Sequence, residues 1–344
     1  MPHNAKWKIL RDFVRKTQAG ATSEEASVRS VKSVGLVRSS LVEKRGVWEK
    51  TKFEVLSEAG WLGLPFDLVV RSEKAVSLAD FSHENSNGVD NTGNVCLWPA
   101  EEILTYLLVA SRMGDTLIPT PATLSLPPPL SLFDVREKRV LEIGAGQGVA
   151  GFFAATSFGT STAVAKSITL TDGNPMVVKT LRENVQHFKE SGVTSGADVV
   201  EAAELKWSED LTRDDIRKLP GASQKDDEPP FDIILAADCL FFKAFHTALA
   251  HTVHLALTCE DQSKYGQAVF INPSRGRSAE AFVTLASTKL EFSPFEKGTF
   301  PPVSPIDIDS SILSTQKKQS EVFVEDRHWP RLLLGVPRRS SLNS

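Results

Sequence analysis

The sequence has 344 residues, 41% hydrophobic and 24% charged, with a formal net charge of −4. These values are typical of a globular protein that buries a full core, and the acidic balance disfavours nucleic acid as the main partner. No apolar run reaches the roughly 18 residues of a membrane span, and there is no signal-peptide core. The three cysteines lack metal-ligand spacing, so we expect no bound metal, a reducing compartment and a cytosolic or nuclear protein.

Residues 1–50 are basic and rich in serine, which predicts a largely disordered tail. Within this tail, Trp7, Leu10 and Val14 lie at helical spacing among lysines and arginines. This pattern predicts a short basic amphipathic helix over Lys6–Lys16. Such helices bind membrane surfaces or acidic grooves, and an organelle-targeting role is an alternative.

Residues 51–113 are predicted to form an extension of strands and one helix ahead of the main domain. Three short runs with strand-like composition indicate strands: Lys52–Leu56, Phe66–Arg71 and Lys74–Leu78. A helix is predicted after Trp98-Pro99, because proline suits its first turn and Glu101 and Glu102 complement its dipole. The proline-rich residues 114–131 then predict a surface loop.

Predicted strands and helices alternate over residues 132–337, and residues 338–344 form a tail. The strands are predicted at 139–144, 167–172, 199–205, 231–237 and 266–272, with one more at 331–336 added to the sheet edge. The helices are predicted near 149–158, 175–189, 243–258 and 277–289. Residues 291–320 are expected to be poorly structured. The alternation indicates an α/β fold with a mainly parallel sheet and right-handed crossovers.

The run Arg139–Gly148, RVLEIGAGQG, opens this alternation with a buried strand, a glycine turn and the start of a helix. Glycines let the chain turn tightly and let a ligand approach backbone N–H groups. We therefore predict cofactor contacts at the acidic residue and the three glycines: Glu142, Gly144, Gly146 and Gly148. The form E-x-G-x-G-x-G resembles the first motif of class I methyltransferases that use S-adenosyl-L-methionine (SAM), and a glycine turn without a ligand is the alternative.

Residues at the other strand ends complete the predicted site, because ligands of open α/β sheets bind beyond the carboxyl ends of the strands. A carboxylate at Asp172 can accept both ribose hydroxyls, whereas Asn174 is better placed as the cap of the next helix. Trp207 is a candidate for an adenine face, with core packing as the alternative. Asp238 can bind an ammonium group, and Phe241 can line the channel that leads an amine to the methyl group.

Longer motifs make the resemblance specific. Asp238–Phe241 fits the D/E-x-x-Y/F motif of the seven-β-strand protein-lysine methyltransferase family, and Asp90–Glu102, DNTGNVCLWPAEE, is similar to a segment of the members that modify calmodulin. Other similar segments occur later in the chain: Thr171–Pro175, Ala237–Phe242, Phe245-His246, Pro273–Gly276 and His328–Leu333. The resemblance covers roughly residues 90–336.

The resemblance implies a Rossmann-like, seven-stranded class I sheet and transfer of methyl groups from SAM to one lysine of calmodulin, up to trimethyllysine. Carried over to matching positions, it implies these cofactor contacts: Trp98, Glu142, Gly144, Gly146, Asp172, Trp207 and Asp238. Phe241 then lies near the target lysine, and Asp238 and Phe241 are the candidate catalytic residues. Two features depart from the family pattern: residues 114–130 form a longer insert, and the expected aromatic and acidic segment is hard to find in 291–320.

Two other functions fit part of the sequence. A methyltransferase of the same fold acting on another protein lysine would bind SAM equally well. A non-catalytic calmodulin-binding module would use the basic N-terminal helix and leave the glycine turn without a role. A nicotinamide-dependent oxidoreductase is disfavoured by the G-x-G-x-G spacing. We expect a monomer with calmodulin as its protein substrate.

Overall fold

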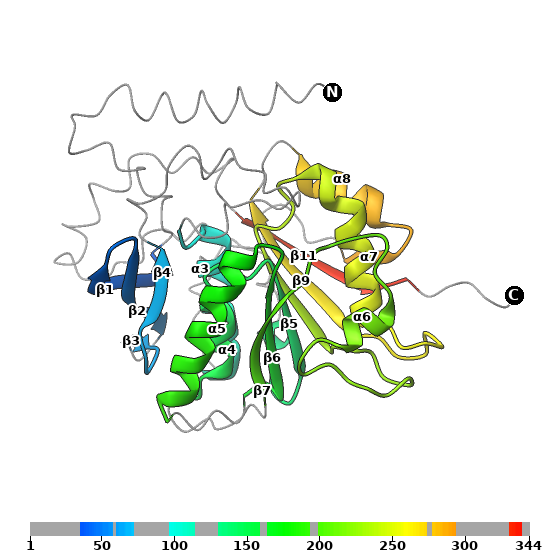
Figure 1. Ribbon diagram of the computed structural model, residues 1–344. Coiled ribbons are helices and arrows are strands. Elements are labelled where there is room, and N and C mark those ends of the chain that lie inside the picture. Colours follow the sequence, from blue (N-terminus) through cyan, green and yellow to red (C-terminus); the bar gives the residue numbers. More distant parts are fainter. Residues whose placement is uncertain are drawn as a thin grey trace, which may run out of the picture.

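The computed structural model describes residues 35–57, 60–71, 96–113, 130–158, 164–192, 199–273, 277–293 and 330–338. Two sheets organise these residues. A seven-stranded sheet has helices on both faces, and a four-stranded antiparallel sheet packs beside helices α3 and α5 (Figure 1). Within the described residues, no helix is both long and apolar enough to cross a membrane.

The seven-stranded sheet has the order β10-β11-β9-β8-β5-β6-β7. Its strands are β5 Arg139–Ile143, β6 Ser167–Asp172, β7 Val199–Glu204, β8 Ile233–Ala237, β9 Gln267–Pro273, β10 Leu290–Ser293 and β11 Pro330–Pro337. Strands β5 to β9 are parallel, whereas β11 runs antiparallel to both β9 and β10. The chain order reverses between β5 and β8, so the crevice expected for a ligand lies beyond their carboxyl ends.

Helices cover both faces of this sheet because successive strand residues point to opposite faces and both faces carry buried apolar side chains. Val140 packs into one core, and Leu141 and Ile143 pack into the other. The helices on the first face are α3 Pro99–Met113, α4 Val149–Ala155 and α5 Pro175–Glu190. Those on the second face are α6 Arg213–Arg217, α7 His246–Leu257 and α8 Ser278–Ala286 (Figure 1). The described residues also form two short 3-10 helices, η3 Leu130–Phe133 and η4 Lys243–Phe245.

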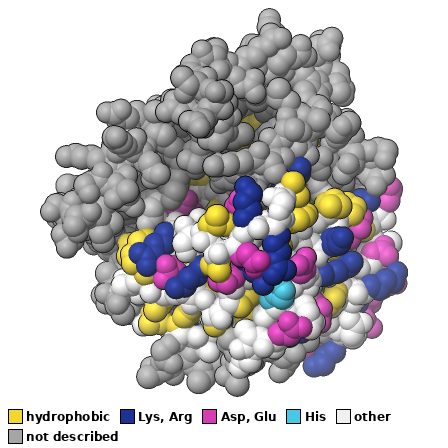
Figure 2. Space-filling model, turned by 60° about the vertical axis from the view of Figure 1, so that its left-hand side comes forward, with side chains coloured by type: hydrophobic (Ala, Val, Ile, Leu, Met, Phe, Trp, Pro, Cys, Tyr) yellow, Lys and Arg dark blue, Asp and Glu magenta, His cyan; other side chains and the backbone are white. Residues whose placement is uncertain are grey.

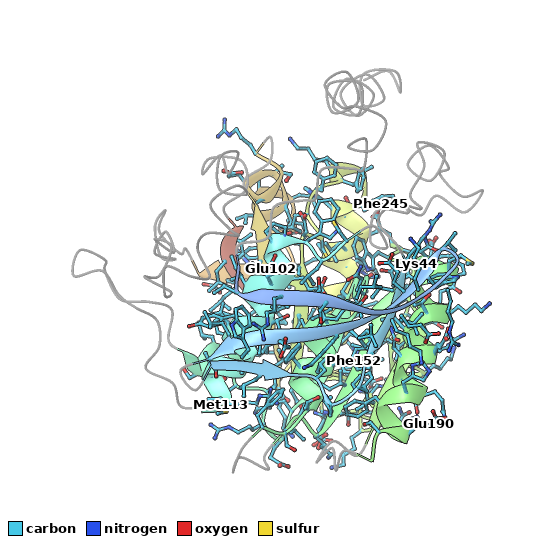
Figure 3. The ribbon with its side chains drawn as sticks, turned by 90° about the vertical axis from the view of Figure 1, so that its left-hand side faces the viewer. Lys44, Glu102, Met113, Phe152, Glu190 and Phe245 are labelled. Atoms are coloured by element: carbon cyan, nitrogen blue, oxygen red, sulfur yellow. The ribbon has the colours of Figure 1, made fainter. Side chains whose placement is uncertain are left out.

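The smaller sheet comprises β1 Val37–Arg45, β2 Trp48–Ser57, β3 Gly60–Gly63 and β4 Leu68–Arg71, and β2 pairs with the other three. Figure 3 views the molecule from the side of this sheet. Asn184 of α5 holds β4: its Oδ1 accepts the Val69 N–H at 2.7 Å, and its Nδ2 donates to the Val69 carbonyl at 2.9 Å. Phe66 adds ring contacts to Phe152 and Phe188. The extension is therefore docked on the helices of the main sheet.

The predicted α/β fold class and the alternation of elements from β5 to β9 are confirmed, with boundaries that differ by a few residues. The strand β1 was missed because every residue after Val37 is exposed, so the segment has the composition of a tail. The strand β10 lies inside the stretch predicted to be poorly structured, and the short helix α6 was also missed.

The placement of the strand near residues 331–336 was wrong. Strand β11 lies between β9 and β10 rather than at the sheet edge. Edge position leaves one side of a strand unpaired, whereas β11 pairs on both sides. Several earlier predictions lie wholly or partly outside the described residues: the helix over Lys6–Lys16, the strand over Lys74–Leu78, the motif residues Asp90–Val95, residues 114–129 of the loop predicted over 114–131, residues 294–320 of the stretch predicted to be poorly structured, and residues 339–344 of the tail.

Candidate active site

The glycine turn joins the end of β5 to the start of α4. Gly144, Gly146 and Gly148 have φ angles of 63°, 53° and 73°, in the left-handed region that favours glycine. A Cβ atom on Gly144 would lie 2.9 Å from Sγ of Cys239 and 3.6 Å from the indole of Trp207. The turn thus needs glycine at Gly144 both for backbone conformation and for close approach of neighbouring side chains.

Asp172 links the glycine turn to the start of α5. Its Oδ2 accepts the Gly146 N–H at 3.2 Å, and its Oδ1 accepts the Asn174 N–H at 2.8 Å. Asn174 is the N-cap of α5, because its Oδ1 accepts the Met176 N–H at 2.9 Å. The preference for Asn174 over Asp172 as the helix cap is therefore confirmed. The Asp172 carboxylate lies at the carboxyl end of β6, beside the turn.

Asp238 and Cys239 follow β8 on the other side of the turn. Asp238 has a φ of 54°, which is uncommon for a residue with a side chain, and its N–H donates to the Ile271 carbonyl at 2.9 Å. The Cys239 thiol donates to the Ile143 carbonyl at 3.1 Å. Burial raises the pKa of this thiol well above its ordinary value, and nearby carboxyl groups raise it further: Asp238, Asp172, Glu142 and Glu101. The site therefore gathers acidic groups around the end of β5.

Glu142 lies beneath the turn rather than at its mouth. It is 2% exposed, and its Oε2 lies against Gly151 of α4 and has no hydrogen bond of good geometry among the described residues. Burial, then the charge of Glu101, raises the pKa of Glu142 well above its ordinary value, although the Gly151 N–H opposes this. The Glu142 carboxyl is thus buried against α4, where its neutral form is favoured over its charged form.

Helix α3 holds both ends of α4, an arrangement that sequence reasoning missed. Glu101 Oε1 accepts the Val149 N–H at 2.9 Å, and Arg112 donates to the Phe153 and Thr156 carbonyls at 2.6 and 2.8 Å. Burial raises the pKa of Glu101 to about 8 and lowers that of Arg112 to about 10. The Glu101 carboxyl oxygen thus accepts a free N–H at the N-terminus of α4, and the Arg112 cation complements the helix dipole at its C-terminus. Helix α3 therefore helps to fix the glycine turn that α4 follows.

Aromatic rings run from the glycine turn to the surface. Trp207, after β7, makes an edge-to-face contact with Phe245 at 6.5 Å between ring centroids. Phe245 lies 6.2 Å from Phe242, and Phe242 lies 4.8 Å from Phe241. Phe241 is 45% exposed, so the series ends at solvent. This arrangement forms an apolar border on one side of the acidic site.

The structure brings most of the predicted site residues together. Asp172, Trp207 and Asp238 surround the turn Gly144–Gly148. Trp98 is half-buried just before α3, where its carbonyl oxygen accepts the backbone N–H groups of Glu101 and Glu102. Its contact with a cofactor stays a prediction.

Comparison with known proteins assigns the family. The model of the lysine methyltransferase family matches residues 82–287. The chain is also 30% identical over 283 residues to calmodulin-lysine N-methyltransferase of Arabidopsis thaliana, covering 81% of this chain and 79% of that protein. This chain belongs to the lysine methyltransferase family. It is a SAM-dependent methyltransferase, as the resemblance implied.

Solved structures give more distant similarities. A TehB-like SAM-dependent methyltransferase from Corynebacterium glutamicum is 19% identical, with 61% of this chain and 86% of that chain covered and a TM-score of 0.34. Spermidine synthase from Thermotoga maritima is 12% identical, with 87% and 72% covered and a TM-score of 0.28. The fold assignment rests on the strand order described above and on the family match.

Proposed function

We propose that this enzyme transfers methyl groups from SAM to a lysine ε-amine of calmodulin, up to trimethyllysine. The observation that carries the substrate assignment is the 30% identity, over 81% of the chain, with the calmodulin-lysine N-methyltransferase of Arabidopsis thaliana. A lysine methyltransferase that acts on a different protein would have the same fold and the same chemistry. The protein that accepts the methyl group distinguishes the two.

The residues around the glycine turn fit SAM. The cofactor carries a positive sulfonium and a positive ammonium group, which acidic residues complement. We assign Asp172 to the ribose hydroxyls, Asp238 to the ammonium group and Trp207 to the adenine face. The turn glycines carry no Cβ atom, so a ligand can approach their backbone closely. Trp98 is proposed as a further cofactor contact.

The remaining residues are proposed to align a neutral amine with the methyl group. When bound, SAM supplies a methyl group on a sulfonium, which is already a good leaving group. Phe241 and Phe242 exclude water from the path of the lysine, and burial lowers the pKa of a lysine amine. Their rings also attract the methylammonium that forms. Positioning therefore supplies most of the rate, and Asp238 orients groups without acting as an essential general base.

Calmodulin is acidic, so basic residues of the enzyme are proposed to guide the encounter. The predicted helix over Lys6–Lys16 is one candidate, and its deletion should raise the KM for calmodulin while the Kd for SAM stays the same. The smaller sheet carries further basic residues: Arg38, Lys44, Arg45, Lys50, Lys52 and Arg71. Figure 2 shows lysine and arginine side chains interspersed with acidic ones on this side of the molecule. An unchanged KM after the deletion would remove the helix from the proposal.

The test is a methyl-transfer assay with labelled SAM. The acceptors are unmethylated calmodulin, with and without calcium, and a lysate that lacks calmodulin. Label on a calmodulin lysine is expected, and Asp172→Ala should abolish it. The matched control is Glu204→Ala, which removes an exposed carboxylate from the neighbouring position of β7 and should leave labelling unchanged. Label only on another lysate protein would overturn the calmodulin assignment.

A further inference from the structure

We propose that Asn272 and His246 are positioning residues that fix the turn Asp238–Phe241 by holding the backbone of Leu240. The inference rests on the proposed function, because this is the turn to which we assign alignment of the lysine. Neither residue belongs to the D-x-x-F motif. Asn272 comes from β9 and His246 from the first position of α7, so the two approach the turn from different elements.

The two hydrogen bonds hold Leu240 from both sides. Asn272 Oδ1 accepts the Leu240 N–H at 3.0 Å, and His246 Nε2 lies 3.0 Å from the Leu240 carbonyl oxygen. A carbonyl oxygen only accepts, so this ring nitrogen carries the proton. Leu240, His246 and Asn272 are all 2% exposed or less. Two side chains thus satisfy both backbone polar groups of one buried residue, and loss of either partner would leave a group unsatisfied.

We call the two hydrogen bonds from Asn272 and His246 to Leu240 the Leu240 clamp, and its position predicts which part of the turn it controls. The start of the turn is fixed independently, because the Asp238 N–H donates to the backbone carbonyl of Ile271. The Leu240 clamp lies at the other end, directly before Phe241, whose ring is 45% exposed. Loss of the clamp should therefore disturb the alignment of the protein substrate at Phe241 more than the binding of SAM near Asp238.

Substitutions of similar size separate the effect of losing the hydrogen bond from the effect of changing the packing. Asn272→Leu removes the acceptor oxygen, whereas Asn272→Asp keeps one. In the Asp variant a second carboxyl oxygen replaces the Nδ2 group, which has no hydrogen-bond partner among the described residues. His246→Gln, which offers an amide donor in place of Nε2, and His246→Leu form a second pair. If one pair fails to fold, the other still tests the clamp.

Asn184→Leu is the matched structural control. Asn184 is also a buried asparagine that holds a backbone N–H, that of Val69, but it lies between α5 and the smaller sheet. It makes two hydrogen bonds to Val69, so its loss should lower the melting temperature at least as much as Asn272→Leu. It should leave kcat/KM unchanged, because its contacts lie away from the turn.

Two readouts are measured on the full chain. Hydrogen exchange of peptides that contain Leu240 should be faster in Asn272→Leu and near the wild-type rate in Asn272→Asp. In methyl transfer to the protein acceptor, Asn272→Leu should lower kcat/KM by at least about tenfold and Asn272→Asp should recover most of it, with the Kd for SAM within about twofold. Unchanged exchange in Asn272→Leu would overturn the clamp.

Faster exchange with unchanged kcat/KM would overturn the positioning role. An equal loss of kcat/KM in Asn184→Leu would also overturn it, by assigning the loss to general instability. Failure of the proposed function is distinguishable: the wild-type enzyme would not methylate calmodulin. The kinetic comparison would then use whichever lysate protein accepts label, and hydrogen exchange would test the clamp without any acceptor.

Discussion

The two ends of the parallel strands use charge in opposite ways. At the amino ends, Arg139 forms ion pairs with Asp232 at 2.7 Å and with Glu228 at 2.6 Å. Hydrogen bonds from Lys225, Arg139 and Ser223 lower the pKa of Glu228 to about 2. At the carboxyl ends, Glu101 and Glu142 are buried near each other, and burial raises the pKa of both.

This difference separates residues that stabilise the fold from residues that prepare a site. Paired charges at the amino ends compensate one another and hold strand starts together. Buried acidic groups with raised pKa values destabilise a fold, and proteins tend to keep them where a ligand uses them. SAM is proposed to bind at the carboxyl ends, beside Asp172 and Asp238, so the comparison predicts separate effects of mutations at the two ends.

The largest expected effect is the loss of SAM binding in Gly144→Ala. The new Cβ would lie 2.9 Å from Sγ of Cys239, on a backbone with a φ of 63°. The Kd for SAM, measured by calorimetry, should rise by at least about 100-fold. Gly192→Ala is the control, because Gly192 also has a positive φ but no atom within 4 Å of its Cβ position. It should cost about 1 kcal/mol of stability and leave SAM binding unchanged.

Arg139→Met should remove the ion pairs at the amino ends of the strands without changing the candidate active site. It leaves Asp232 and Glu228 without their shared partner, so the free energy of unfolding in urea should fall by about 2 kcal/mol. This figure is below that of a fully buried pair because both carboxylates are about one-quarter exposed. The Kd for SAM should stay the same. A parallel loss of SAM binding would contradict the independence of the two ends.

Glu101→Gln should change how stability depends on pH. The pKa of Glu101 is about 8 when folded, against an ordinary value of 4.5, so the folded state binds the proton more tightly. The stability this gives is present below pH 4.5 and is lost as pH rises through 8. Between pH 6 and pH 9 the wild type should therefore lose about 2.5 kcal/mol more stability than Glu101→Gln, in which Oε1 can still accept the Val149 N–H. The prediction fails if the free energy of unfolding in urea changes by the same amount between pH 6 and pH 9 in both proteins.

The smallest expected effect is that of Asp227→Ala, also near the amino ends. Asp227 pairs with Lys264 at 2.9 Å, but both side chains are more than half exposed. Exposed pairs contribute little, so the free energy of unfolding should change by less than about 0.5 kcal/mol. If the free energy of unfolding fell as much as in Arg139→Met, burial would not explain why the Arg139 ion pairs stabilise the fold.

Local patterns in the sequence were enough to predict much of the main sheet and the glycine turn. Strand β8 is a continuous apolar run, and β5 is apolar apart from Arg139 and Glu142, so both are visible without a structure. The competition between Asp172 and Asn174 for the cap of α5 was also resolved locally, because Pro175 follows Asn174 directly.

Contacts between distant residues could not be predicted in the same way. Glu101 and Val149 are 48 residues apart, and Leu240 and Asn272 are 32 apart, so each pair depends on how the elements pack. The position of β11 inside the sheet likewise follows from the pairing of neighbouring strands. Strand β1 shows the converse problem, because an exposed strand lacks the apolar alternation on which strand prediction depends.

The place of β11 also bears on how the protein is synthesised. Strands β9 and β10 leave the ribosome before β11, yet each pairs with β11 and not with the other. Until residue 337 has been translated, both strands have unpaired backbone edges that favour aggregation or capture by chaperones. Sequence changes in β11 should therefore lower the yield of folded enzyme, while the molecules that do fold keep their specific activity.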